Sequence, residues 1–146
     1  MAHPAALARP GGIDAFQGFQ FEYSPLATTQ ISLWDEWMRL FLATARRQGL
    51  DASMGTHLYQ AFVAGLPLHR YMDVHLVHPG DELAPAAAEQ TLRSILPLIE
   101  KFGIANAEEL KIDTFAARYR AEVATKGAVH MAPPVVRAWT RTELAT

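Results

Sequence analysis

The first clear hydrophobic pattern along the chain is IDAFQGFQF, residues 13–21, which is rich in aliphatic and aromatic side chains and has neither alternating face fully polar. The residues before it, Arg9-Pro10-Gly11-Gly12, have the composition of a turn, because proline fixes one dihedral angle and glycine tolerates positive φ. We therefore expect a turn that leads into a strand from Ile13 to Phe21.

Helical spacing follows in three further segments. Apolar residues recur every three or four positions from Pro25 to about Gln48, which predicts a helix with a broad apolar sector. A shorter helix is expected over residues 56–63. A long one is expected over residues 83–102, with a kink at Pro97 because proline removes a backbone donor.

The C-terminal third predicts one more helical region. Asn106 and Glu109 have the spacing of a capping box, and Asp113 is expected to cap the helix that follows. Apolar residues then line one side of that helix, and Gly127 is expected at its C-terminal end. The apolar side consists of Phe115, Tyr119 and Val123.

Two later segments have strand character. Residues 70–78, RYMDVHLVH, alternate between two faces, and residues 135–140 form the last strand candidate. Pro133-Pro134 predicts a bulge or an edge position at the start of that last strand. The order strand, helix, helix, strand, helices, strand predicts an α/β fold in which three strands make a thin sheet for so much helix.

Composition limits the classes of function. The chain has 146 residues, which fits one domain over residues 1–146, and its formal net charge of −2 gives no electrostatic case for nucleic acid or an anionic membrane. The absence of cysteine excludes disulfides, thiolate metal sites and thiol nucleophiles. The lack of cysteine fits a reducing cytoplasm, which is the expected location. We find no convincing signal peptide and no apolar run long enough to span a bilayer.

Four segments in order resemble one family. They are ARPGGIDAFQ, LDASMGTHLYQAFVAGLPLHRYMD, RSILPLIEKFGIANAEELKIDTFAARYRAEV and PPVVRAWTR. Together they resemble the C-terminal, substrate-side half of class I S-adenosylmethionine-dependent methyltransferases of the small-molecule type. The resemblance implies a partial Rossmann-like sheet of about three strands under a helical cap. In that family the RPGG-like turn enters the fifth strand, a later helix leads into the sixth, and the last strand returns antiparallel beside it.

The same resemblance implies that the cofactor-binding half is missing. The strand from Ile13 would pair with a preceding family strand that this sequence does not contain. No G-x-G pair occurs, so no residue is assigned to S-adenosylmethionine, which enters as a cofactor by resemblance only. Relatives often carry a carboxylate near the end of the first strand, whereas this chain has Gln17-Gly18-Phe19-Gln20.

The candidate substrate-binding residues fall into two groups. Gln17 and Phe19 share one face of the first strand, near the carboxyl end where α/β proteins bind ligands. Four residues lie on a helix that resembles the family's substrate cap and would form an apolar wall, although a core stripe is the alternative reading. They are Trp34, Trp37, Met38 and Phe41.

Histidine chemistry is sparse in the sequence. His57 is the candidate general base, because imidazole titrates near neutrality, but no partner carboxylate can be assigned to it. His75 and His78 would lie on opposite faces of a strand, so we expect no shared metal there.

Three hypotheses stay open. The chain supplies the substrate half of a methyltransferase whose cofactor-binding strands come from another polypeptide, and it holds the acceptor in line with the sulfonium methyl. Alternatively, it is a non-catalytic module that binds a small hydrophobic ligand or self-associates through the exposed edge of the Ile13 strand. The third possibility is an inactive truncated remnant.

Overall fold

The chain forms two compact units. The computed structural model describes residues 9, 11–23, 26–57 and 69–141. A sheet unit is formed by residues 1–22, 53–74 and 133–146, and a helical unit by residues 23–52 and 75–132.

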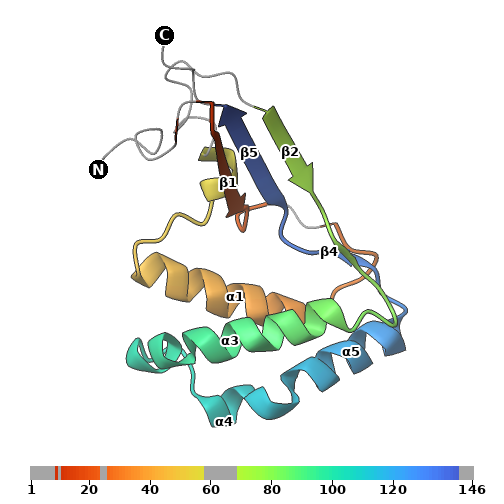
Figure 1. The fold of residues 1–146 in the computed structure, drawn as a ribbon. Helices are drawn as coiled ribbons and strands as arrows, with labels where there is room; N and C mark the ends of the chain where they lie inside the picture. Colours follow the sequence, from red (N-terminus) through yellow and green to blue (C-terminus); the bar gives the residue numbers. More distant parts are fainter. Residues whose placement is uncertain (1–8, 10, 24–25, 58–68, 142–146) are drawn as a thin grey trace. The chain divides into compact units, whose positions relative to one another are not determined.

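The described part of the sheet unit contains three strands. They are β1 (Ile13–Phe19), β2 (His69–Asp73) and β5 (Val135–Arg141), in the order β1-β5-β2. β5 is antiparallel to both neighbours, so β1 and β2 run parallel to each other (Figure 1). The prediction of a three-stranded sheet whose last strand is antiparallel is confirmed.

The hydrogen bond beyond the end of β1 shows which backbone groups face β5. The Gln20 N–H donates to the Pro134 carbonyl at 2.9 Å, and the register of β1 on β5 continues to this pair. Residues of an antiparallel pair alternate between bonded and non-bonded positions. The even residues of β1 therefore bond to β5, and the N–H and C=O groups of its odd residues point to the opposite edge.

β1 ends two residues before the predicted boundary because Gln20 turns the chain. The buried Gln20 side chain donates from Nε2 to the Glu22 carbonyl at 2.6 Å and accepts the Thr56 N–H at 3.0 Å. Of the two alternatives predicted for the start of the last strand, a bulge or an edge position, the edge position is wrong, since β5 is the central strand. Pro133-Pro134 is compatible with this position because both prolines precede the strand and Pro134 contributes only its carbonyl.

A helical turn at residues 54–57 packs on the even face of the sheet. A Cβ added at Gly55 would lie 3.0 Å from Cγ2 of Val136 and 3.1 Å from Cβ of Gln20, so this close approach favours glycine. The remainder of the predicted helix over residues 56–63 lies outside the described residues.

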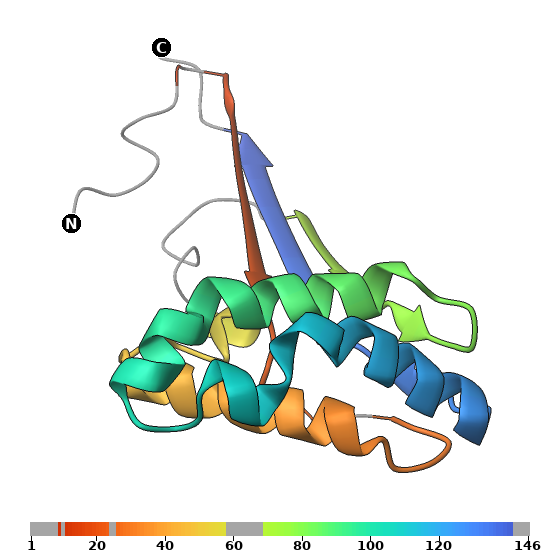
Figure 2. The ribbon, with the colours of Figure 1, turned by 90° about the horizontal axis from the view of Figure 1, so that it is seen from below.

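Three helices dominate the helical unit. α1 (Ser32–Arg47), α3 (Leu83–Lys101) and α5 (Phe115–Lys126) lie side by side (Figures 1 and 2). α3 runs through Pro97 without ending there. The unit also contains three short elements besides a 3₁₀ turn at Ile112–Thr114. They are α4 (Ala107–Leu110), β3 (Leu76–Val77) and β4 (His130–Met131), the last two being paired antiparallel.

Two predicted elements are wrong at their boundaries. The first helix begins at Ser32 rather than Pro25, because the Leu26 carbonyl accepts the Met131 N–H and Ala27 bridges His130. The predicted strand over residues 70–78 is split into β2 and β3, which belong to different sheets. Alternation of side chains continues across this break and therefore does not reveal it.

The C-terminal region agrees with the sequence in most respects. The capping box is present, since Asn106 Oδ1 accepts the Glu109 N–H and the Glu109 carboxylate accepts the Asn106 N–H. Gly127 ends α5 in the left-handed region with φ 54°. The apolar side of α5 is buried as predicted, at Phe115, Tyr119 and Val123.

Carboxylates from neighbouring helices cap two helix N-termini. The residue before α1 is Ile31, which has no capping side chain; instead Glu122 of α5 accepts the N–H groups of Ser32 at 2.8 Å and Leu33 at 3.0 Å. The predicted cap of α5 by Asp113 is wrong, because Glu89 of α3 accepts the Ala116 N–H at 2.9 Å.

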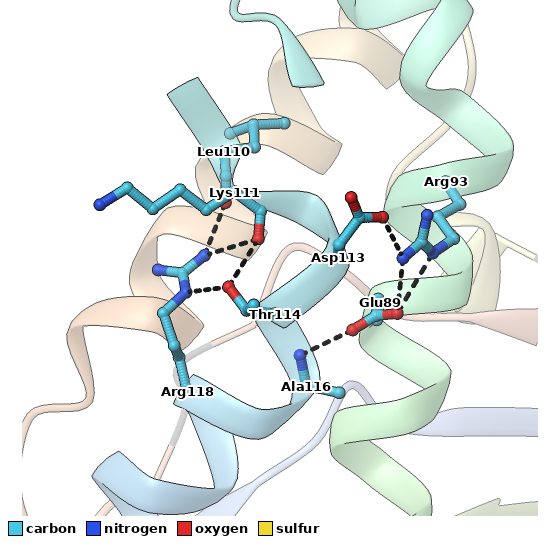
Figure 3. A network of polar contacts seen from close by, with 8 residues as sticks. All are labelled: Glu89, Arg93, Leu110, Lys111, Asp113, Thr114, Ala116 and Arg118. Carbon is cyan, nitrogen blue, oxygen red and sulfur yellow. Dashed lines mark hydrogen bonds and ion pairs between the residues drawn. The ribbon is translucent and has the colours of Figure 1, made fainter. Parts of the chain in front are cut away.

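Figure 3 shows how the α5 cap is held. Arg93 donates to Glu89 and also to Asp113, so the side chain expected to cap α5 instead forms an ion pair with α3. On the other side of the same turn, Arg118 donates to the carbonyls of Leu110 and Lys111. The hydrogen bond from Ala116, opposed by burial and aided by Arg93, lowers the pKa of Glu89.

We predict that Glu122→Gln lowers the free energy of unfolding by about 1 kcal/mol near neutral pH, because an amide offers one acceptor oxygen for two helix donors. Burial opposes ionisation of Glu122, but the hydrogen bonds from Lys126, Leu33 and Ser32 win and lower its pKa. The stabilisation is therefore present above the ordinary pKa of 4.5 and is lost as the pH falls through the folded-state pKa.

Urea unfolding at several pH values measures this difference. The matched control is Glu108→Gln, which changes an exposed carboxylate at the start of α4. Equal stability of the Glu122 and Glu108 variants at neutral pH would contradict the role of Glu122 as a cap.

Candidate functional site

A groove of about 430 Å³ lies on the sheet unit. Residues directly opposite each other in adjacent strands share a face, so the register brings Ala15 beside Trp139, and Gln17 and Tyr71 beside Arg137. We call this surface the odd face. The groove is lined by Ile13, Ala15, Phe16, Gln17, Tyr71, Arg137, Ala138 and Trp139.

One polar row crosses this largely apolar groove. Arg137 Nε donates to Gln17 Oε1 at 3.3 Å, and Arg137 also forms an ion pair with Asp73. All three side chains are exposed. Arg137 thus fixes the orientation of the Gln17 amide, whose nitrogen makes no hydrogen bond within the described part of the chain. Apolar walls with a few oriented polar groups are the usual chemistry of small-molecule sites.

The sequence identified only part of this groove. Gln17 lines it, and Phe19 lies on the same face at the end of β1, stacked on Phe21 with ring centroids 5.4 Å apart. Tyr71, Arg137 and Trp139 were missed. Only the register of β5 against both neighbours brings them together, although alternation along β5 would have placed Arg137 and Trp139 on one face.

The predicted aromatic wall belongs to the helical unit. Trp34 and Trp37 are buried and stacked at 5.0 Å, and Phe41 stacks on Trp37 at 5.4 Å. Trp37 Nε1 donates to the Ala88 carbonyl of α3 at 3.0 Å. Met38 and Phe41 are partly exposed. Their role against a substrate stays a prediction, and the surroundings of Trp34 and Trp37 are those of a helix-packing core.

His57 is exposed at the end of the turn at residues 54–57. It belongs to the sheet unit but does not line the groove. Its role as a general base therefore stays a prediction without a mechanism.

A buried tyrosine–histidine pair lies beside Trp34. Tyr119 Oη and His130 Nε2 are 2.5 Å apart, and both side chains are almost wholly buried. His130 Nδ1 and Trp34 Nε1 have no hydrogen-bond partner within the described residues. Burial raises the pKa of Tyr119 and lowers the pKa of His130, although the Met131 backbone and the charges of Asp81 and Asp35 favour the imidazolium. The pair is neutral near pH 7.

His75 has a carboxylate partner that the sequence did not reveal. Its Nε2 lies 2.6 Å from Asp81 Oδ2, while Asp81 Oδ1 accepts the N–H groups of Leu83 and Ala84 at the start of α3. Burial opposes ionisation of Asp81, but the hydrogen bonds from His75 and these N–H groups lower its pKa. Asp81 thereby orients a half-exposed imidazole while it caps a helix.

A second cavity of about 310 Å³ adjoins this pair in the helical unit. The loop at residues 78–82 and α5 form its walls, and Asp81, Glu82 and Arg120 contribute charged groups. Within the described ranges, no three side chains of the metal-ligating types gather closely enough to hold an ion. In the described part of the chain, no helix is both long enough and apolar enough to cross a membrane.

No protein-family model matches this chain, and no curated protein sequence matches it.

We predict that the free energy of unfolding falls as the pH drops below about 6.5, the ordinary pKa of histidine. The lowered folded-state pKa of His130 means that the unfolded chain binds the extra proton first, so stability rises with pH across this range. His130→Gln should flatten that part of the pH dependence.

Chemical denaturation between pH 5 and 8 measures this slope. Histidine is the only side chain whose unperturbed pKa lies in this range. His78→Gln provides the control, because His78 is exposed and its Nδ1 hydrogen-bonds to the carbonyl of the adjacent Pro79. An unchanged slope in the His130 variant would show that its burial does not control acid sensitivity.

Proposed function

We propose that this chain is the substrate-side half of a methyltransferase-like fold of the S-adenosylmethionine-dependent class, and that it binds a small, largely apolar molecule. The observation that carries the proposal is the position of β5, antiparallel between two mutually parallel strands. The family that the sequence resembles has this return of its last strand beside the sixth. The order in which β1, β2 and β5 occur along the chain also follows that resemblance.

The chain's own residues do not fit the methyl donor. The sequence has no G-x-G turn to receive a nucleoside cofactor. The one acidic residue that ends a described strand, Asp73 of β2, forms an ion pair with Arg137. The cofactor-binding strands would come from a segment that this sequence does not include, on the same or another polypeptide. We therefore assign no transfer step to this chain.

The chain contributes a surface that binds and orients the substrate. Tyr71 and Trp139 offer aromatic area on the odd face, and the Gln17 amide nitrogen is available to donate a hydrogen bond to a ligand oxygen. Orientation of an acceptor by such groups accelerates transfer mainly through proximity.

A non-catalytic ligand-binding module is the second candidate function. The groove favours it, because its described lining contains aromatic, aliphatic, amide, phenol and guanidinium groups but no serine, threonine, lysine, carboxylate or histidine. Both functions require the groove to bind a small molecule, and they differ in whether a cofactor-binding segment joins the chain.

We predict that isothermal titration of the chain alone shows no binding of S-adenosylmethionine or S-adenosylhomocysteine. Binding of either at micromolar affinity would overturn the assignment of the chain to the substrate side. The sample has to be folded and monodisperse by light scattering for the negative result to count.

Fluorine NMR of protein labelled with 5-fluorotryptophan tests the groove itself. The chain has three tryptophans, of which Trp139 lines the groove and Trp34 and Trp37 lie in the helical core. With 8-anilinonaphthalene-1-sulfonate as the probe, we expect the Trp139 signal to shift and the other two to stay in place.

Ala15→Trp should abolish this shift because it fills the groove. Ala121→Trp, which places the same side chain in the second cavity, should preserve it. A shift confined to the Trp34 and Trp37 signals would contradict the groove as the binding site.

A further inference from the structure

The outer edge of β1 has a regular row of backbone groups that no described strand pairs with. β1 is the first strand in the sheet order, so in the part of the chain that the structure describes no strand lies beyond it. The N–H and C=O groups that point to this edge belong to the odd residues, as the Gln20–Pro134 hydrogen bond shows. These residues are Ile13, Ala15, Gln17 and Phe19.

The side chains at both ends of this edge are apolar and exposed. Ile13 is 57% exposed and Phe19 is 45% exposed, although both lie in a strand. An exposed edge with such side chains templates the addition of another strand. Natural proteins block edges with proline, inward charges or bulges, and residues 13–19 contain no proline and one charged residue, Asp14.

We propose that two copies of this chain pair through β1, antiparallel and about a two-fold axis at Phe16. This register puts each Ile13 opposite Phe19 of the second copy, and each Ala15 opposite Gln17 of the second copy. All four pairings join odd residues, so each can exchange two backbone hydrogen bonds. The Phe16 residues then meet at a non-hydrogen-bonded position.

The strand is complementary to itself in this register. An aliphatic β-branched residue meets an aromatic one at both ends, which is a favourable cross-strand pair. Asp14 falls opposite Gly18 of the second copy, so no like charges oppose each other. Shifting the register by two residues in either direction separates Ile13 from Phe19 and reduces the overlap of the two strands.

Pairing also extends the groove. Ile13, Ala15 and Gln17 line the groove and share one face of β1. In the dimer, Phe19 of the second copy lies opposite Ile13 on this same face. The second copy thus adds an aromatic side chain at the groove's outer wall. The dimer is proposed for the chain alone. A cofactor-binding segment that joined the chain under the proposed function would pair with this same edge of β1 and would exclude the second copy.

Two double variants test the register through charge. Ala15→Glu with Gln17→Glu puts carboxylates opposite each other in the dimer, whereas Ala15→Lys with Gln17→Glu puts a lysine opposite each carboxylate. Both keep Glu at position 17 beside Arg137, so the comparison isolates position 15. We expect the dimer dissociation constant from sedimentation equilibrium to differ by about tenfold or more between them.

Single cysteines test the axis directly, because the chain has no cysteine of its own. Under mild oxidation, Phe16→Cys should form a disulfide-linked dimer in preference to Ala15→Cys and Gln17→Cys, which would cross-link if the axis were shifted. Cross-linking that favours position 15 or 17 would overturn the proposed register. Equal, monomeric behaviour of the two charge variants and the unmodified chain would overturn the dimer.

Discussion

The sheet unit depends on the pairing of the last strand with the first. β5 is hydrogen-bonded to β1 on one side and to β2 on the other, and the described strands β1 and β2 have no other partner. The segments that meet here are more than 100 residues apart along the chain for β1 and β5. Closing such a long loop costs conformational entropy before the strands make stabilising contacts. The sheet therefore forms only when the C-terminal segment pairs with β1 and β2. The groove, the polar row through Arg137 and the outward-facing edge of β1 all follow from this one position of β5.

In the helical unit, carboxylates satisfy the backbone N–H groups at the start of α1 and α5. A helix leaves its first N–H groups without partners, and neither α1 nor α5 has a capping side chain at its own N-cap residue. Glu122 and Glu89 provide the acceptors from neighbouring helices. Because each carboxylate belongs to one helix and caps another, capping also fixes how the helices are placed within the unit. Asp81 differs, since it caps α3 locally and binds His75 as well.

Local signals predicted the local parts of this structure. The turn before Ile13 is present, since the Gly12 N–H donates to the Arg9 carbonyl at 2.8 Å. Like this turn, the Asn106–Glu109 capping box and the apolar side of α5 depend on neighbouring residues and were predicted correctly. The start of α1 was not, because Ala27 bridges to His130, about 100 residues away in the chain. The caps from Glu89 and Glu122 depend on which helices pack together, which periodicity does not reveal.

The residues of the candidate groove also fall into those that local sequence signals identified and those that they missed. Gln17 could be singled out from its place near the end of the first strand, but Arg137, Tyr71 and Trp139 required the register of three strands. Likewise, Trp34 and Trp37 form an apolar stripe by spacing alone, and only packing against α3 and α5 shows that they are buried. The break between β2 and β3 was not predicted, because the side chains on both sides of it follow the same alternation.

Residue-resolved amide hydrogen exchange by NMR, in dilute protein, tests the central position of β5 most directly. The account predicts slow exchange at every amide from residue 135 to residue 140, since alternate groups bond to β1 and β2. For the monomer it also predicts that β1 alternates, with slow exchange at Asp14, Phe16 and Gly18 and fast exchange at the odd residues, which only a second copy would protect. Alternating protection within β5 itself would make it an edge strand and would contradict the account.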